Sequence, residues 1–142
     1  SRGPTEEERS VIESARHIAA IAIERDRTQA AIERGREQLQ MILDAMPISI
    51  AYVDDKLRYH FVNRAFEQWF GTTRAKAIGS ESPDIIGADL YAAIAPYLQR
   101  VMTGEEVRYE AERVGRDGKR RFVDVHYLPH FAEDGRVLGH FG

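Results

Sequence analysis

The chain has 142 residues, of which 43% are hydrophobic and 30% are charged, and its formal net charge is −3. This size and composition predict one globular domain with an additional segment. The mixed, mildly acidic charge excludes the basic surface of a nucleic-acid-binding protein, and no apolar run reaches the roughly 18 residues of a membrane helix. The absence of cysteine excludes disulfides, thiolate nucleophiles and cysteine-ligated metals, and it fits a cytoplasmic location.

Residues 5–46 form one long predicted helix or two helices end to end. Thr5 is a candidate cap, and three glutamates follow it in the first turn, where the helix dipole favours negative charge. Apolar residues recur every seven positions, interrupted by Arg25. They are Val11, Ile18, Ile32, Leu39 and Met46, with Ala15, Ala22 and Leu43 in a parallel line. This pattern is typical of a coiled-coil seam, so we expect either a dimeric stalk or a solvated linker.

After Pro47 the apolar period changes to two. We expect a strand at 48–53, a turn at 54–56 and a second strand at 59–62. Asn63 is placed to cap a short helix that ends at Gly71, because the apolar residues after it have helical spacing.

Three further helical segments are expected between residues 73 and 104. Thr73 can cap the first, Ser82 followed by Pro83 can begin the second, and Gly87 can close it. The third, residues 89–102, contains Pro96, where we expect a kink or a break.

Strands are predicted at 107–114, at 121–131 and from 137 onward. Because successive side chains of a strand point to opposite faces, the length of the loop between the first two strands decides which of their residues share a face. A two-residue turn at Asp117 and Gly118 would put Tyr109 on the same face as Asp124 and His126. A three-residue loop with Gly118 left-handed shifts the register by one, so that the apolar residues of both strands share a face. The apolar match favours the three-residue loop, with Tyr109 and Tyr127 inside and Asp124 and His126 outside.

This order of elements resembles the PAS sensor family over about residues 40–142. The resemblance rests on ILDAMPISIAYVDDKLRYHFVNRAFEQWFG, on TGEEV, and on RVGRDGKRRFVDVHYLPHFAEDGRVLGHFG. It implies an α+β PAS fold, with a five-stranded antiparallel sheet and short helices on one face. We expect this domain at 45–142, with its last strand truncated because Gly142 precedes the Asp-Ile-Thr that usually closes such domains.

The segment HIAAIAIERDRTQAAIERGREQL is similar to the closing helix of a GAF domain that runs into a PAS domain. Residues 1–44 are therefore expected to be a signalling linker helix. The resemblance implies a regulatory domain of a bacterial multidomain signalling protein, a sensor histidine kinase in the first place and a diguanylate cyclase in the second. Its partners would be a second copy of the chain, joined through the helix, and flanking domains of the same protein.

The PAS resemblance also implies a small-molecule pocket between the helices and the sheet, which a ligand-free dimerisation module would not use. The candidate lining residues are all aromatic: Phe61, Trp69, Tyr91, Tyr109 and Tyr127. The absence of cysteine argues against covalent flavin. The absence of histidine from residues 89–102, where haem-binding relatives usually supply the iron ligand, argues against haem.

A different class of function, a small cone-shaped α+β enzyme, would use Asp124 and His126, which lie two apart on one predicted strand. It requires both side chains inside a cavity. A metal site formed by His126, His130 and His140 is disfavoured, because a two-residue turn at Asp134 and Gly135 sets His130 opposite Gly139 and puts His140 on the other face.

Overall fold

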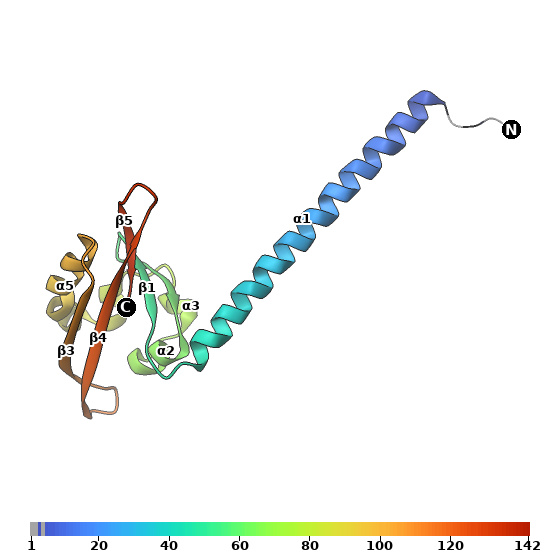
Figure 1. Cartoon of the computed structure of the whole chain (residues 1–142). Helices are drawn as coiled ribbons and strands as arrows, with labels where there is room; N and C mark the ends of the chain where they lie inside the picture. The colour runs from blue at the N-terminus through green and yellow to red at the C-terminus, as the bar shows by residue number, and fades with distance from the viewer. Residues whose placement is uncertain (1–2, 4) are drawn as a thin grey trace. The chain divides into compact units, whose positions relative to one another are not determined.

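The computed structural model describes residue 3 and residues 5–142. The chain divides into two compact units, residues 1–41 and residues 42–142. The first unit holds most of helix α1, Glu6–Ala45, and the second begins with the last residues of that helix. The second unit contains all the strands and the remaining helices (Figure 1).

Helix α1 is a single helix of 40 residues, which is the first of the two arrangements expected from the sequence. A reciprocal cap begins it: the Glu8 N–H donates to Thr5 Oγ1 at 3.2 Å, and the Thr5 N–H donates to Glu8 Oε2 at 2.7 Å. No residue of the helix is buried, and Val11, Ile18 and Leu39 of the predicted seam are each more than 60% exposed. The helix therefore presents an uncovered apolar seam.

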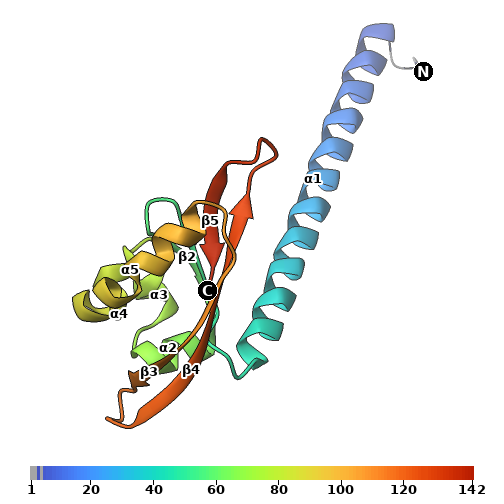
Figure 2. The same ribbon diagram turned by 60° about the vertical axis from the view of Figure 1, so that its left-hand side comes forward.

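The second unit is a five-stranded antiparallel sheet with the order β2-β1-β5-β4-β3. Helices α2 to α5 lie on one face of the sheet, called the inner face below (Figures 1 and 2). The predicted α+β architecture is confirmed. The strands are β1 Ala51–Asp54, β2 Tyr59–Val62, β3 Val107–Val114, β4 Arg120–Phe131 and β5 Val137–Phe141, and the helices are α2 Arg64–Phe70, α3 Arg74–Ala77, α4 Ser82–Ile86 and α5 Ala88–Met102.

Two groups of buried residues join the sheet to the helices. One connects β1 and β2 to α2 and α3, and the other connects β3 and β4 to α5. Helix α5 runs without interruption through Pro96, so no break forms there. Ile94 and Leu98 are buried on either side of the exposed proline, and their packing holds the helix across the missing backbone hydrogen bond.

The predicted register of β3 and β4 is confirmed. Val107 pairs with Tyr127 and Tyr109 pairs with Val125. The Gly115 N–H donates to the Lys119 carbonyl at 2.9 Å, which leaves a three-residue loop in which Gly118 has φ 76°. Since side chains of paired residues share a face, this loop sets which side chains face the helices.

Gly118 allows a clean test of this loop, because nothing lies within 4 Å of the position that a Cβ would occupy. We expect Gly118→Ala to lower the free energy of unfolding by about 1 kcal/mol, since alanine disfavours left-handed backbone. Gly118→Asn is the matched control and should cost less, because asparagine tolerates this conformation. Urea denaturation of both variants measures the difference, and equal losses would contradict the conformational explanation.

Candidate functional site

Three tyrosines form a connected group on the inner face between β4, β3 and α5. Tyr127 is buried, and its hydroxyl lies 3.2 Å from the hydroxyl of Tyr109. The Tyr109 ring stacks on Tyr97 of α5 with 3.7 Å between centroids and 9° between planes. Burial, followed by the hydrogen bond with Tyr109, raises the pKa of Tyr127 above its ordinary value of 10.0. The Tyr127 hydroxyl is therefore a neutral polar group among buried apolar side chains.

His140 of β5 adjoins this group and is only 3% exposed. Its ring meets Tyr127 edge to face, with 5.5 Å between centroids. Its Nδ1 atom is buried without a hydrogen-bond partner in the described part of the chain. Burial lowers the pKa of His140 from 6.5 to about 4, because water no longer solvates the imidazolium. At neutral pH the ring is uncharged and offers an unused polar nitrogen inside the domain.

The other predicted pocket residues are more scattered. Tyr91 is half-buried and packs against the same group of core residues as Tyr109. Trp69 is half-buried on α2 and lies beneath Arg121, whose guanidinium carbon is 5.5 Å from the ring centroid. Trp69 therefore contacts the β3–β4 hairpin, whereas Tyr91, Tyr109 and Tyr127 belong to the group of core residues that connects β3 and β4 to α5.

Phe61 does not lie on the inner face. The pairing of β1 with β2 shifts by one residue, so Tyr52 pairs with Phe61 and Val53 pairs with Tyr59, leaving His60 as the extra residue. Paired side chains share a face, and Val53 and Tyr59 are buried in the core. Phe61 consequently shares the outer face with Tyr52. The strict alternation read from the sequence fails here because a bulge reverses the parity.

Asp124 and His126 lie outside, as the register predicts. Asp124 is paired with Arg108, with 2.7 Å between Arg108 Nη2 and Asp124 Oδ2, and this hydrogen bond lowers the pKa of the carboxyl group. His126 Nε2 lies 2.6 Å from Glu106 Oε1. Both side chains are exposed and are occupied by surface partners. The enzyme hypothesis required them inside a cavity, so this position contradicts it.

The three histidines of the last two strands do not converge. His130 pairs with Gly139, as predicted, and its Nδ1 lies 2.7 Å from the Tyr52 hydroxyl on the outer face, whereas His140 is buried on the inner face. The predicted two-residue turn is wrong. The loop has three residues and ends at Gly135, whose φ is 87°. A bulge between His130 and Phe131 compensates for the extra loop residue, so His130 still pairs with Gly139. No cluster of metal-ligating side chains occurs among the described residues.

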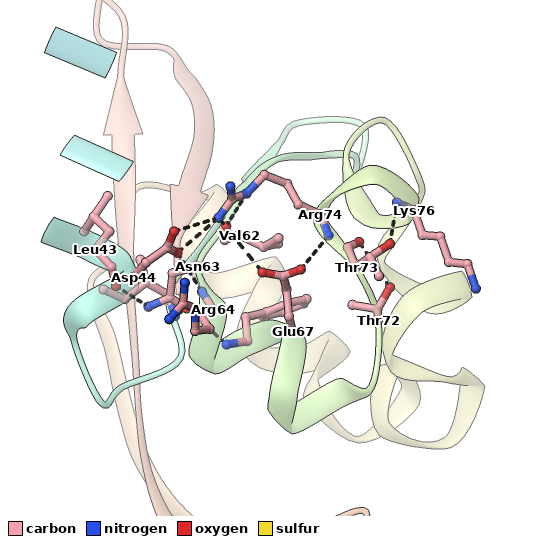
Figure 3. A network of polar contacts seen from close by, with 12 residues as sticks. Leu43, Asp44, Val62, Asn63, Arg64, Glu67, Thr72, Thr73, Arg74 and Lys76 are labelled. Atoms are coloured by element: carbon pink, nitrogen blue, oxygen red, sulfur yellow. Dashed lines mark hydrogen bonds and ion pairs between the residues drawn. The ribbon is translucent and has the colours of Figure 1, made fainter. Parts of the chain in front are cut away.

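The most complete polar site lies where α1 meets the domain, around Asn63 (Figure 3). Asn63 is fully buried. Its Oδ1 accepts from the N–H of Ile50 at 2.9 Å and from the N–H of Phe66 at 3.1 Å, and its Nδ2 donates to the carbonyls of Leu43 at 2.9 Å and Ile48 at 2.8 Å. One side chain therefore binds the end of α1, the connection to β1 and the first turn of α2. It also explains why β1 begins at residue 51 and not at the predicted 48.

A second contact at this junction involves Asp44 and Arg74. Arg74 Nη2 lies 3.0 Å from Asp44 Oδ1, and the same oxygen accepts from the Arg64 N–H at 2.8 Å. Arg74 also donates from Nε to the Val62 carbonyl at 3.3 Å, and its backbone N–H donates to Glu67 Oε2 at 2.9 Å. The last turn of α1 is thus held by one amide and one ion pair, together called the junction below.

Sequence reasoning identified Asn63 as a helix cap but missed His140, Asp44 and Arg74 as site residues. For His140 the period-two pattern of β5 did carry a signal, since it placed the ring on the face opposite His130. Asp44 and Arg74 are 30 positions apart, and no local pattern connects them.

Comparison with known proteins agrees with this architecture, since the model of the PAS fold family matches residues 43–142. The chain belongs to the PAS fold family. Its PAS domain is a sensory domain with a role in signalling. A comparison with curated proteins finds no match. Among the described residues, no helix is long and apolar enough to cross a membrane.

Solved structures similar to this chain include other PAS domains. The PAS domain of Bordetella pertussis BvgS is 18% identical, with a TM-score of 0.52 over 76% of this chain and 81% of the other. A Colwellia psychrerythraea PAS domain is 17% identical, with a TM-score of 0.58 over 74% and 90%. VqmA of Vibrio cholerae, solved with ligand and DNA, is 19% identical, with a TM-score of 0.62 over 74% and 48%. At these identities the likeness shows the fold alone.

Replacing Asn63 tests the junction. Asn63→Ala leaves the buried N–H of Phe66, the half-buried N–H of Ile50 and two carbonyls without this partner, and we expect the free energy of unfolding to fall by about 3 kcal/mol. Thr73→Ala is the comparison, because Thr73 caps α3 through a single bond to the Lys76 N–H and should cost only about 1 kcal/mol. Urea denaturation measures both, and equal losses would show that Asn63 acts only as a cap.

His140 predicts a pH dependence of stability. Its pKa of about 4 lies below the ordinary 6.5, so protons bind the unfolded chain more tightly. Above pH 6.5, His140 is neutral in both the folded and the unfolded chain and its protonation does not affect stability. As the pH decreases to 4, protonation of the unfolded chain lowers the free energy of unfolding by about 3 kcal/mol. His140→Phe should lose this component, while His17→Phe, on the exposed part of α1, should follow the parent chain. Urea denaturation between pH 7 and pH 4 measures the free energy of unfolding of all three proteins. The same pH dependence in all three would contradict the attribution to His140.

Proposed function

We propose that this PAS domain is a cytoplasmic regulatory domain of a bacterial multidomain signalling protein, a sensor histidine kinase, and that it relays a ligand or partner signal through a dimeric helical linker. The observation that carries the proposal is the junction. Asn63 Nδ2 and the Asp44–Arg74 ion pair attach the last turn of α1 directly to the domain core. A change in the core can therefore act directly on the last turn of α1.

The proposed ligand site on the inner face is formed by Tyr91, Tyr109 and Tyr127 together with His140. Tyr91, Tyr109 and Tyr127 offer apolar rings, and the hydroxyls of the last two and His140 Nδ1 offer polar contacts. Trp69 belongs to the proposed lining at the hairpin end, and Phe61 does not, because it lies on the outer face. A ligand acts as a signal only if it binds two states of the domain with different affinity.

A short path through the sheet connects these residues to the junction. His140 on β5 pairs with Val53 on β1. Three residues before Val53, the Ile50 N–H donates to Asn63 Oδ1, and Asn63 in turn donates to the Leu43 carbonyl of α1. A displacement of β5 relative to β1 would reach the helix end through these hydrogen bonds. This path supports the proposal as a physical route.

The uncovered seam of α1 supports the dimer. Long isolated helices are marginal in water, and an apolar stripe on a helix of 40 residues is stabilised by packing against a second helix. The similarity of residues 17–39 to a GAF-to-PAS linker agrees with the same arrangement. A diguanylate cyclase would use such a linker equally well, so the output domain is chosen by resemblance alone.

A ligand-free dimerisation module is the alternative of a different kind, and the packed stack of Tyr97 on Tyr109 favours it. Native mass spectrometry distinguishes the two readings. A small molecule released from the chain on denaturation supports the sensor, and a chain of unmodified mass after gentle purification supports the ligand-free relay.

The dimer is tested with two substitutions that add the same charge to α1. We expect the parent chain to sediment as a dimer at micromolar concentration. Ile32→Glu places a carboxylate in the seam and should shift the chain to monomer, whereas Gln38→Glu lies off the seam and should leave the dimer intact. Sedimentation velocity measures all three proteins. A monomeric parent chain, or equal behaviour of the two variants, would reject the helical interface.

A further inference from the structure

An open groove of about 500 Å³ lies between α2, α3 and the β3–β4 hairpin. It is lined by three cationic side chains, Arg64, Lys76 and Arg116, together with the polar residues Thr72 and Thr73. The lining of this groove includes none of the aromatic residues proposed for the inner-face pocket. This cationic groove is therefore a separate feature of the domain.

The three cations make no ion pair with any described residue. The carboxylate that also lines the groove, Glu67, accepts a hydrogen bond from the Arg74 N–H at 2.9 Å and lies 4.0 Å from the Arg74 guanidinium. Glu67 is thus already engaged by a cation outside the groove. Figure 3 shows Arg64 and Lys76 on opposite sides of Glu67, with the Lys76 ammonium clear of the drawn network.

The groove is built by segments far apart in the sequence. Arg116 comes from the loop between β3 and β4, yet its guanidinium lies against Gly71 at the end of α2, where an added Cβ would overlap it. Gly71 has φ 65°, so the glycine both ends the helix and admits the arginine. Nearby, Arg121 of β4 covers Trp69, which holds the same hairpin against α2. The position of Arg116 is therefore a consequence of the fold.

We propose that the cationic groove binds a small multivalent oxyanion, a phosphorylated or polycarboxylate molecule. Guanidinium and ammonium groups form charge-assisted hydrogen bonds to phosphate and carboxylate oxygens, and threonine hydroxyls can add neutral ones. The volume lies within the range of small-molecule sites. The formal charge of the whole chain is −3, so the attraction is local to the groove and does not extend to a long polyanion such as nucleic acid. The proposal is independent of the signal proposed for the inner face.

The test titrates the full chain with pyrophosphate and with citrate at constant ionic strength, followed by calorimetry and by NMR chemical shifts. Both probes should bind, with shifts centred on residues 64–76 and 116. Lys76→Gln combined with Arg116→Gln should weaken binding at least tenfold. The control combines Lys56→Gln with Arg136→Gln, which removes two charges from turns outside the groove and should change the affinity less than twofold.

Equal weakening in the two double variants would mean general charge attraction and would overturn the proposal, as would the absence of millimolar binding by the parent chain. Binding to vesicles of anionic phospholipid without binding of either soluble probe would also overturn it in favour of a membrane headgroup. If the groove double variant fails to fold, the single Lys76→Gln variant decides, since the Lys76 side chain makes no described hydrogen bond or ion pair. That variant should still weaken binding several-fold.

Discussion

The fold depends on a buried asparagine that uses its full hydrogen-bonding capacity. Asn63 is completely inaccessible to water, and each hydrogen bond that a buried amide fails to make costs free energy. Its oxygen accepts twice and its nitrogen donates twice, so no polar atom of the side chain is left unsatisfied. The partners come from α1, from the connection to β1 and from α2, so this one side chain links the three segments. The end of the helix is thereby part of the core of the PAS domain.

His140 is the opposite case, and the contrast separates a structural group from a candidate functional one. Its Nδ1 is buried without a partner among the described residues, in a strand at the centre of the sheet. The domain keeps this ring neutral through burial, at a cost in stability below pH 6.5. A phenylalanine would fill similar space without that cost. An unsatisfied nitrogen on a ring that packs edge to face against Tyr127 agrees with the ligand contact proposed above, and β5 and β1 connect His140 to the junction.

The sequence predicted the architecture well and the site in part. The register of β3 and β4 followed from parity, because only the three-residue loop at Gly118 puts the apolar residues of both strands on one face. The same rule failed in β2, where a bulge at His60 turns Phe61 outward. A bulge leaves no local signature, since it arises from how β2 meets its neighbour. Ser82 begins α4 as the sequence predicts, but the bond between its hydroxyl and that of Tyr59, 23 positions away, could not be read from the local pattern.

By itself, the sequence determined everything that depends on neighbours along the chain: the long helix with its cap at Thr5, the helix starts at Asn63 and Thr73, and the glycine turns. These features arise from local backbone preference and from apolar period, both of which can be read in a short window. Only the tertiary structure decided which polar side chains meet. Asp44 and Arg74, Asn63 and Leu43, and Gly71 and Arg116 are brought together by the packing of the sheet against its helices. Such contacts are selected by the free energy of the whole fold, and that is why the junction and the cationic groove became visible only in three dimensions.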